Sequence, residues 1–399
     1  MDINIKEQLQ QKEFEALKGK TRVILKWATG VGKSKMAIDL ANYVVGLHSS
    51  KIKVLFVVAE RAHMKNWRVE FQKWGLMDKC MDITMICYHS LHKMEGEHFD
   101  FAVFDEAHHA FTEKRKEILK TMHIHYIIML SATLSYQKEM EIGEIFGKFT
   151  TSTVTLKEAV SSNILPDPRV YVLKMSLDDT VADQEIKTGE GNNLPEVSWA
   201  NRKQYLFRKV PCVIKCTARQ KYNYLTEMME YWKQRYERSH NQFQHNRWVN
   251  IGSQRKRFLG ELKTSAVRDI IEAFPKDKRF ICFCASVAQA NELSTDSTIS
   301  SKRSSKLNQQ VIDAFNDKKL HRIYAVGMAN EGLNLTEIQA GIIIQLDGKE
   351  RLFIQKFGRS LRAEDPVAYI FCFEHTQDEK YLSTALENID EKFIKFIKI

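Results

Sequence analysis

A glycine-containing loop at residues 28–34 is the first place where this sequence could perform chemistry. It reads Ala-Thr-Gly-Val-Gly-Lys-Ser and lies between an apolar run at 23–27 and a helical pattern at 36–45. In such a loop glycines let the backbone wrap phosphate groups, successive N–H groups attract anions, a lysine reaches the β- and γ-phosphates, and a hydroxyl binds Mg²⁺. The general motif has glycine where this chain has Trp27, so the loop must begin without glycine's freedom. We expect a nucleoside triphosphate with Mg²⁺ here, bound by Thr29, Gly30, Val31, Gly32, Lys33 and Ser34.

Two adjacent carboxylates, Asp105 and Glu106, directly follow the apolar run 101–104. Ligands gather at the carboxyl ends of parallel strands, so side chains just after a strand are candidates for a site. An acid there can hold the metal that Ser34 contacts, and the next acid can polarise a water for attack on the γ-phosphate. Adjacent acids are also common on surfaces, but these end an apolar strand downstream of a phosphate-binding loop. The pattern therefore favours Asp105 as a metal ligand and Glu106 as the base.

Small hydroxyl residues mark a further strand end. Ser131 and Thr133 follow the apolar run 126–130. Together with His108 they are expected to couple the nucleotide site to a neighbouring surface through hydrogen bonds. The alternative for Ser-Ala-Thr is an ordinary helix N-cap.

Two arginines in the second half of the chain, Arg359 and Arg362, lie three residues apart, with Gln355 one turn earlier. Side chains at this spacing share a helical face and can reach a common anion. Arginines that a second lobe supplies to a phosphate held by the first make hydrolysis depend on lobe closure. The alternative is a solvated helix face, of which Arg-x-x-Arg is also typical.

The same pattern of expected strands and helices, which must position these residues, occurs twice along the chain. The 399 residues suggest two domains. Short continuous apolar runs alternate with helical patterns over 21–133 and again after 275, which indicates strands covered on both faces of a parallel sheet. We expect an α/β fold of two tandem parallel-sheet lobes joined by a basic, mainly helical segment, with boundaries at 1–168, 169–265 and 266–399. The serine-rich stretch 294–305 is expected to be a loop.

The positive charge is concentrated between residues 201 and 263. This stretch holds fifteen lysines and arginines against four glutamates, while the whole chain has a net charge of +10. Aromatic residues are interleaved with the cations, a combination that suits phosphate contacts and base stacking. The alternative is a buried helical stripe of aromatic residues with a solvated basic face. We expect Arg255, Lys256 and Arg257 to contact nucleic acid.

Composition excludes several classes of protein. The 44% hydrophobic and 28% charged residues are typical of a folded domain, and no apolar run is long enough to cross a membrane. The N-terminus lacks the layout of a signal peptide, so we expect a cytoplasmic protein, in a bacterial or phage-infected cell. Seven scattered cysteines fit reduced thiols better than a disulfide framework.

Taken together, these residues resemble motifs I, II, III, V and VI of the superfamily 2 helicases, in order and with ordinary spacing. The matching stretches are 28–34, 105–108 as a DEAH-type motif II, 131–133, 330–334 and 355–362. Residues 156–160 and 164–166 also resemble the exit from the first lobe in the branch of type III restriction subunits, XPB-like and phage DNA helicases. The resemblance covers nearly the whole chain. It implies two RecA-like lobes, ATP hydrolysis at their interface and movement along nucleic acid.

The resemblance also implies roles for residues that the patterns alone leave open. Gln11 is similar to the glutamine of the N-terminal nucleotide-contacting motif, and Arg61 and Ser90 lie in stretches similar to nucleic-acid-contacting motifs. Gly332 and Gln355 would line the cleft between the lobes. Arg359 and Arg362 would sense the γ-phosphate. Lys356 departs from the arginine often found in this branch.

The resulting expectation is an ATP- and Mg²⁺-dependent helicase or translocase that acts on nucleic acid, with DNA favoured over RNA. Other expected partners are proteins of replication, repair or restriction, and a monomer would suffice. The alternative is a duplex-DNA translocase, or an ATPase motor subunit of a restriction or remodelling complex, that does not separate strands. Both share every motif above. A binding module with a dead ATPase site is disfavoured by the intact Lys33, Glu106 and Arg362.

Overall fold

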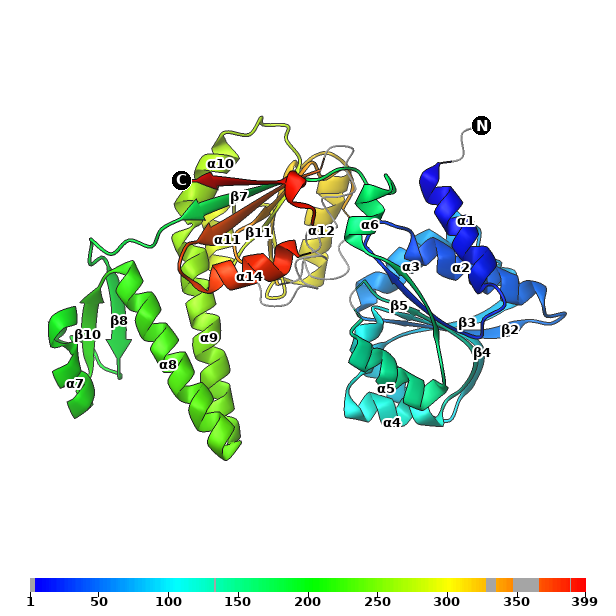
Figure 1. Cartoon of the computed structure of the whole chain (residues 1–399), viewed down its shortest axis with the longest axis horizontal. Coiled ribbons are helices and arrows are strands. Elements are labelled where there is room, and N and C mark those ends of the chain that lie inside the picture. The colour runs from blue at the N-terminus through cyan, green and yellow to red at the C-terminus, as the bar shows by residue number, and fades with distance from the viewer. Residues whose placement is uncertain (1–3, 133, 328–334, 347–365, 388) are drawn as a thin grey trace.

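The computed structural model describes residues 4–132, 134–327, 335–346, 366–387 and 389–399. It contains two α/β lobes, and a helical hairpin with a small sheet extends from the second lobe (Figure 1). Each lobe has its own parallel sheet, so the expected fold class is confirmed. Five residues with predicted roles lie outside the described residues, namely Thr133, Gly332, Gln355, Arg359 and Arg362.

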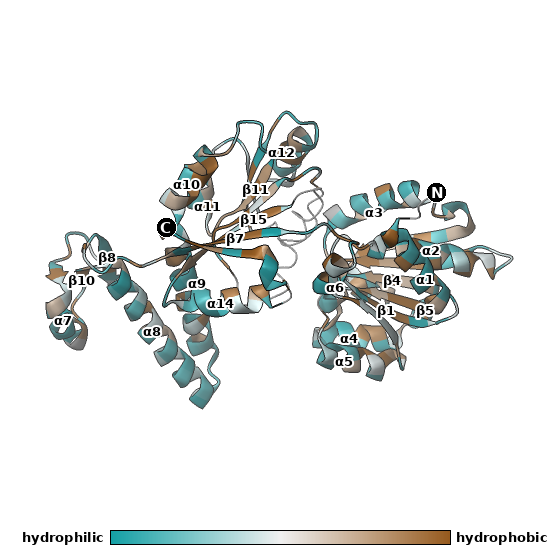
Figure 2. Cartoon of the chain, turned by 45° about the horizontal axis from the view of Figure 1, so that its top comes forward, coloured by the Kyte–Doolittle hydropathy of each residue, from teal (hydrophilic) through white to brown (hydrophobic). Residues whose placement is uncertain are grey.

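The first lobe contains a six-stranded parallel sheet in the order β3-β2-β4-β5-β1-β6. Its strands are β1 (Arg22–Trp27), β2 (Ile52–Val58), β3 (Met81–Cys87), β4 (His98–Asp105), β5 (His123–Leu130) and β6 (Thr150–Val154). The central strands are buried on both faces, as their continuous apolar sequences predict. Figure 2 shows these strands as the most hydrophobic part of the lobe, beneath more hydrophilic helices.

Helices cover both faces of this sheet. The helical elements are α1 (Ile5–Leu17), α2 (Lys33–Gly46), α3 (Arg61–Trp74), η1 (Asp78–Cys80), η2 (Tyr88–Met94), η3 (Ala107–Ala110), α4 (Glu113–Thr121), α5 (Tyr136–Phe146) and α6 (Leu156–Ser161). Helices α1, α2 and α3 pack into one hydrophobic cluster, and α4, α5 and η2 pack into the cluster on the opposite face. Helices α2 and α3 and elements η2 and η3 each begin at the carboxyl end of a strand, which is where the predicted site residues lie.

The second lobe contains a seven-stranded sheet in the order β12-β13-β11-β14-β15-β7-β16, with every pair parallel. Its strands are β7 (Arg169–Met175), β11 (Phe280–Phe283), β12 (Thr298–Ser300), β13 (Arg322–Val326), β14 (Ala340–Ile343), β15 (Val367–Phe373) and β16 (Ile394–Lys398). Helices α12 (Ser305–Asn316) and α14 (Gln377–Leu386) pack into one cluster. Helices α10 (Thr264–Glu272) and α11 (Val287–Leu293) pack into the other, and η6 (Glu391–Phe393) precedes β16.

Two segments of the second lobe differ from what the sequence predicts. Strand β7 lies inside the stretch expected to be an insertion, yet it pairs with β15 and β16, because its apolar residues fill a place between those two strands. The serine-rich stretch expected to be a loop contains β12, which pairs with β13. Its Thr298 and Ser300 are buried, and Thr298 Oγ1 donates to the Ser294 carbonyl while the Ser300 N–H donates to Asn308.

The residues between β7 and α10 form a separate extension. A three-stranded sheet comes first, with β8 (Gln184–Thr188), β9 (Glu196–Ser198) and β10 (Cys212–Cys216), and it is accompanied by η4 (Trp199–Asn201) and α7 (Arg202–Arg208). Helices α8 (Ala218–Ser239) and α9 (Gln242–Leu262) then form a long hairpin that projects from the second lobe (Figure 1). The basic segment is therefore part sheet and part helix. Among the described residues, no helix is both long enough and apolar enough to span a membrane.

Candidate nucleotide-binding site

The register of the first sheet brings the two predicted halves of the nucleotide site to one edge. Leu130 of β5 is the register partner of both Leu25 in β1 and Asp105 in β4. The glycine loop after β1 and the acid pair after β4 therefore lie on the same edge, separated by a single strand. Ser131 follows Leu130 and donates its backbone N–H to the Leu25 carbonyl at 3.1 Å. Three predicted groups thus share one strand edge.

The loop itself requires glycine at two positions. Gly30 and Gly32 have φ angles of 94° and 111°, in the left-handed region that other residues avoid. Gly32 is also the N-cap of α2, and a Cβ there would lie 2.2 Å from the Nε2 of Gln10. Helix α2 starts at Lys33, so its first N–H groups and positive dipole end face the loop. This is a geometry that binds anions.

Lys33 is held against the loop. Its Nζ donates to the carbonyl of Trp27 at 2.8 Å and approaches that of Ala28 at 3.4 Å. The ammonium also acts on the acid pair: burial raises the pKa of Asp105, and the charge of Lys33 opposes that rise. The structure therefore brings the lysine and the metal-binding candidate within electrostatic range of each other.

Trp27 replaces the glycine of the general motif without strain. It is the last residue of β1, pairs with Val154 in β6, and has no positive φ. Its side chain is fully buried, and Nε1 donates to the hydroxyl of Ser152 at 2.8 Å, which in turn donates to Glu13 at 2.7 Å. The loop turns only after this residue. Trp27 thus anchors the start of the loop to β6 and α1.

The glutamine that contacts the loop is Gln10, which directly precedes the predicted nucleotide contact Gln11. Gln10 is buried and its Nε2 donates to the Val31 carbonyl at 2.8 Å, while Lys6 Nζ donates to the Gly30 carbonyl at 2.7 Å. Gln11 is exposed and bonds Glu15 on its own helix. Neighbouring helical residues point about 100° apart, so only one of the two glutamines can face the loop. The spacing of Gln10 to the buried Leu17 was the signal that could have identified it.

Asp105 is fixed by two aromatic side chains. Its Oδ2 accepts a hydrogen bond from Trp67 Nε1 at 2.9 Å, and its backbone carbonyl accepts one from the Tyr88 hydroxyl at 3.0 Å. Burial raises the pKa of this carboxyl, and the charge of Glu106 raises it further. The charges of His63 and Lys33 and the Trp67 hydrogen bond act in the opposite direction. A cation placed beside the carboxylate would favour its ionised form in the same way.

Glu106 turns away from the strand in an unusual conformation. Its φ of 49° lies in the left-handed region, where a residue with a side chain is strained. Its Oε2 lies 3.4 Å from Nδ1 of the buried His108, whose carbonyl accepts from Lys138 at 3.3 Å. Such strain is typical of functional sites. The predicted base and the predicted coupling residue are therefore in direct contact.

The oxygen ligands at this edge fit Mg²⁺. The described residues contain no group of three or more His, Cys, Asp or Glu side chains placed to hold a metal ion by themselves. Mg²⁺ commonly binds one or two protein oxygens and completes its shell with phosphate and water. A carboxylate from Asp105 and a hydroxyl from Ser34 are oxygen donors of the kind that this hard cation prefers.

Two predicted nucleic-acid contacts lie on the same edge. Arg61 is the exposed first residue of α3, after β2, and Ser90 is half-buried in η2, after β3. Strands β2 and β3 are neighbours in the sheet. Their carboxyl ends extend this edge beyond Asp105.

The predicted contact at Arg255, Lys256 and Arg257 is not one patch. Arg255 is buried, donates to Thr226 Oγ1 at 3.0 Å, and lies over the Tyr222 ring at 5.7 Å. Lys256 is half-buried and only Arg257 is exposed. Three consecutive helical residues point in three directions, so the expectation for Arg255 is wrong.

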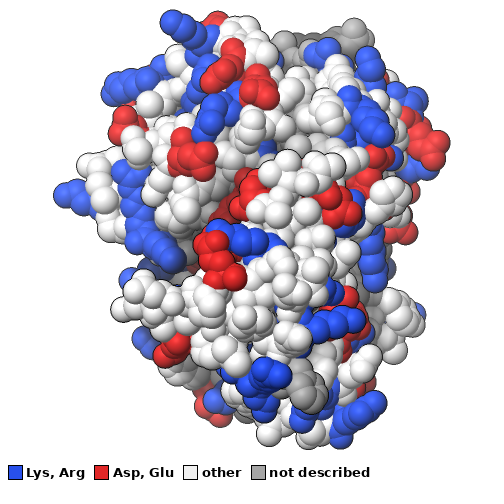
Figure 3. Space-filling view, turned by 90° about the vertical axis from the view of Figure 1, so that its left-hand side faces the viewer, with Lys and Arg blue, Asp and Glu red and all other residues white. Residues whose placement is uncertain are grey.

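Other basic residues of the extension also have structural roles. Lys263 is completely buried, and its Nζ contacts Asp378 at 2.6 Å and the carbonyls of Ile344 and Phe371. In Figure 3 basic and acidic side chains are interspersed over the face that the extension presents. On this face the positive charge therefore does not form a single stripe.

The far end of the hairpin carries cations and rings together. Tyr231 and Phe243 are exposed, with Arg235 over the first ring at 5.3 Å and Arg247 over the second at 5.4 Å. Trp232 meets Phe243 edge-on at 6.0 Å between ring centroids. At its base, by contrast, the buried Tyr222 joins a cluster with the second lobe. The aromatic residues thus form a buried contact at the base and a surface cluster at the tip.

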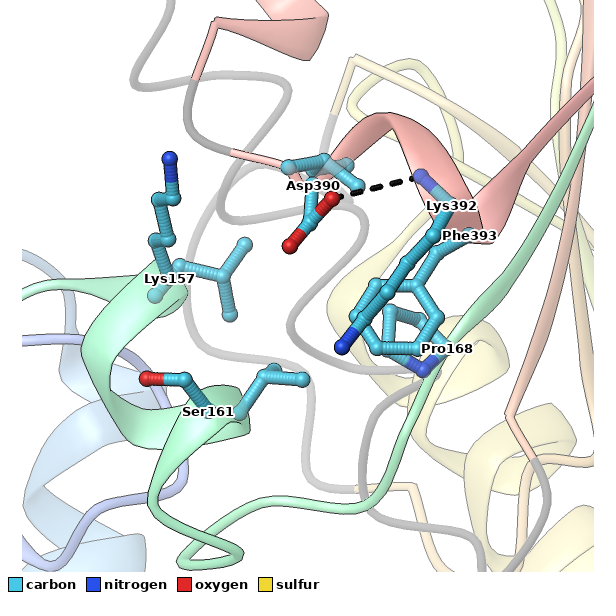
Figure 4. A pocket seen from close by; sticks show the side chains of 9 residues that line it. Lys157, Ser161, Pro168, Asp390, Lys392 and Phe393 are labelled. Atoms are coloured by element: carbon cyan, nitrogen blue, oxygen red, sulfur yellow. Dashed lines mark hydrogen bonds between the residues drawn. The ribbon is translucent and has the colours of Figure 1, made fainter.

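A small, partly open pocket lies between α6 of the first lobe and residues 389–393 of the second. Figure 4 shows Lys157 and Ser161 of α6 on one side and Asp390 and Phe393 on the other. The Asp390 carboxylate accepts the backbone N–H of Lys392 at 3.3 Å. None of the residues that line this pocket belongs to the glycine loop or the acid pair. It is therefore a feature of the junction rather than part of the nucleotide site.

Sequence families match both lobes. Residues 3–136 match the family described as type III restriction enzyme, res subunit, and residues 262–364 match the helicase conserved C-terminal domain. The first match contains the glycine loop and the acid pair. The second contains the three residues at 355–362 with predicted roles.

Individual proteins are similar over most of the chain. The "DNA 3'-5' translocase XPB2" of Sulfurisphaera tokodaii is 22% identical over 404 residues, covering 92% of this chain and 82% of that protein. Among solved structures, the Pyrococcus furiosus Hef helicase domain has a TM-score of 0.53 and 13% identity, covering 94% of this chain and 97% of that one. The DNA-bound type ISP restriction-modification enzyme LlaBIII has a TM-score of 0.59 and 14% identity, covering 100% of this chain and 31% of that one. At these identities the two structures are evidence for the fold alone.

Proposed function

The chain belongs to the superfamily 2 helicases, and on this basis we propose that it is an ATP-driven motor that moves along DNA. The family and the two lobes make it an ATP-hydrolysing enzyme. DNA is favoured over RNA because the similar archaeal protein is named a DNA translocase.

The main support for the proposal is that Leu130 pairs with both Leu25 and Asp105. This pairing brings the glycine loop and the acid pair to the same edge of the sheet. It supports a site in which the loop N–H groups and Lys33 bind the β- and γ-phosphates of ATP. Ser34 and Asp105 would hold Mg²⁺, which neutralises charge on the phosphate oxygens during hydrolysis. Glu106 would orient and deprotonate the attacking water.

The second lobe would complete the site. We assign Arg359 and Arg362 to the γ-phosphate and place Gln355 and Gly332 along the cleft, on the resemblance of residues 330–334 and 355–362 to helicase motifs. The match of 262–364 to a helicase C-terminal domain supports this assignment. Ser131, Thr133 and His108 would transmit the state of the phosphate to the DNA-contacting edge.

The proposed DNA surface starts at the carboxyl edge of the first lobe. Arg61 and Ser90 extend that edge, and both are accessible. On the hairpin, the exposed Arg257 replaces Arg255 as the proposed phosphate contact. An arginine that neutralises one phosphate adds a salt-dependent increment to binding.

The experiment that tests the proposal is ATP hydrolysis by the full chain against single-stranded DNA, duplex, forked DNA and RNA. DNA should stimulate turnover more than RNA. Lys33→Ala should abolish stimulated hydrolysis, because it removes the ammonium that we assign to the β- and γ-phosphates. Lys35→Ala is the matched control on the same helix, since that lysine pairs with Asp39 at 2.8 Å. Full turnover in Lys33→Ala, or equal loss in Lys35→Ala, would contradict the site.

A second candidate is a duplex translocase that does not separate strands, as a motor of a restriction or remodelling complex. The match of the first lobe to a restriction-enzyme subunit favours it. Strand displacement on forked DNA, compared with triplex displacement on continuous duplex, distinguishes the two. Triplex displacement without fork unwinding would support the translocase.

A further inference from the structure

His63 is a buried histidine without a hydrogen-bond partner. It lies in the first turn of α3 and is 7% exposed, and neither of its ring nitrogens is hydrogen-bonded to any described residue. A neutral imidazole has one donor and one acceptor, and buried polar atoms are almost always paired. Leaving both atoms unpaired costs stability. Both ring nitrogens are therefore available to hydrogen-bond a bound ligand or a water that accompanies it.

The position of His63 indicates what that partner is. His63 and Trp67 are four residues apart and so share one face of α3. From this face Trp67 donates to Asp105 at 2.9 Å. The imidazole also lies within electrostatic range of the Asp105 carboxyl. The face of α3 that carries the imidazole is therefore the face that meets the proposed metal ligand.

We propose that His63 is a positioning residue for the magnesium of Mg-ATP, and that its ring hydrogen-bonds a water in the hydration shell of the ion held by Asp105. Mg²⁺ gives up its waters reluctantly, so such waters remain near its protein ligands. Side chains that bond the outer shell orient the ligands and strengthen metal binding. The inference rests on the proposed function, because it requires Mg-ATP at this site.

The test measures metal-dependent nucleotide binding rather than turnover. The full chain is titrated with a fluorescent, non-hydrolysable ATP analogue in EDTA, and again at increasing MgCl₂, for wild type, His63→Leu and His63→Gln. Leucine removes both ring nitrogens and keeps an apolar side chain of similar bulk. His321→Leu is the matched control, because His321 is half-buried in the second lobe and its Nδ1 is also unpaired. Thermal unfolding is recorded for each variant.

We expect His63→Leu to raise the half-saturating Mg²⁺ concentration about 10- to 100-fold, the usual effect of losing an outer-shell partner. Its affinity in EDTA should equal that of wild type, and its melting temperature should not fall, since the substitution removes unpaired polar atoms. His63→Gln should recover part of the loss, because an amide can donate and accept. His321→Leu should behave as wild type.

Two results would overturn the inference while leaving the proposed function intact. One is an unchanged Mg²⁺ requirement in both His63 variants. The other is an equal loss of affinity with and without Mg²⁺, which a purely structural role predicts. If wild type itself binds nucleotide with no dependence on Mg²⁺, the proposed function fails, and this inference fails with it.

Discussion

Replacing Trp67 with phenylalanine tests how Asp105 is held at the nucleotide site. The indole Nε1 donates to Asp105 Oδ2 at 2.9 Å, and the substitution removes that donor. The aromatic packing would largely remain, because Trp67 lies 5.1 Å from Phe56 and 5.8 Å from Phe71 between ring centroids. A hydrogen bond to a charged group contributes about 1.5–3 kcal/mol. Its loss should lower kcat/KM for Mg-ATP about 10- to 150-fold, since about 1.4 kcal/mol corresponds to a factor of ten.

The Trp67→Phe substitution should also shift the pH dependence of the ATPase activity. Burial already raises the pKa of Asp105, and the Trp67 hydrogen bond works against that rise. Without the donor, the pKa of this carboxyl should rise further. The carboxyl must be ionised to bind Mg²⁺, so the acidic limb of the pH–activity profile should move to higher pH. On acidification, activity should therefore be lost at a higher pH than in wild type.

Trp74→Phe is the matched control for this experiment. Trp74 lies on the same helix, and its Nε1 donates to Glu70 at 2.6 Å, so the chemical change is identical but does not involve Asp105. We expect its ATPase activity to stay within about twofold of wild type. DNA-stimulated hydrolysis and thermal unfolding are measured for both variants. Equal effects in the two, or a Trp67→Phe enzyme with wild-type kcat/KM and pH profile, would refute the reasoning.

Two further predictions each compare two nearby residues of the same helix, one expected to have a functional role and the other not. Gln10→Ala removes the hydrogen bond to the Val31 carbonyl, which contributes about 0.5–1.5 kcal/mol. A fluorescent ADP analogue should therefore bind this variant about 2- to 10-fold more weakly than wild type. Gln11→Ala should bind the analogue with wild-type affinity, because Gln11 bonds only Glu15 on its own helix among the described hydrogen bonds. Equal affinities of the two variants for the analogue would contradict a role for Gln10 in nucleotide binding. Arg257→Glu should weaken DNA binding and reduce the slope of log affinity against log salt concentration by about 0.9. Arg255→Glu should chiefly lower the melting temperature, because it places an unpaired carboxylate between α8 and α9. An unchanged salt slope in Arg257→Glu would remove that residue from the DNA surface.

Much of the first lobe could be predicted because its signals are local. The continuous apolar runs that form β2, β4 and β5 need both faces covered, which specifies a parallel sheet without knowledge of the partners. The glycine loop is local as well, since Gly30 and Gly32 have the positive φ angles that only their residue type adopts easily. Asp105 could be placed because it directly follows a strand.

The remaining features depend on information that a short window of sequence lacks. The apolar sequence of β7 would fit a strand in either sheet. Only its pairing with β15 and β16, which come much later in the chain, assigns it to the second lobe. The choice between Gln10 and Gln11 depends on the rotation of α1 against the loop. Arg255 is buried because α8 covers that side of α9, which no count of charges reveals. The role of Trp27 became clear only once Ser152 and Glu13 were seen beside it.

The strand order of the two sheets has a consequence for how the chain folds during synthesis. All six strands of the first sheet come from residues 22–154, so this sheet can be completed early on the ribosome. In the second sheet, β7 is made first but pairs only with β15 and β16, from residues 367–398. Its two edges stay unpaired while the small sheet, the hairpin and four other strands are made. Unpaired strand edges invite wrong pairing, so the nascent second lobe should be the part of this protein that depends on chaperones.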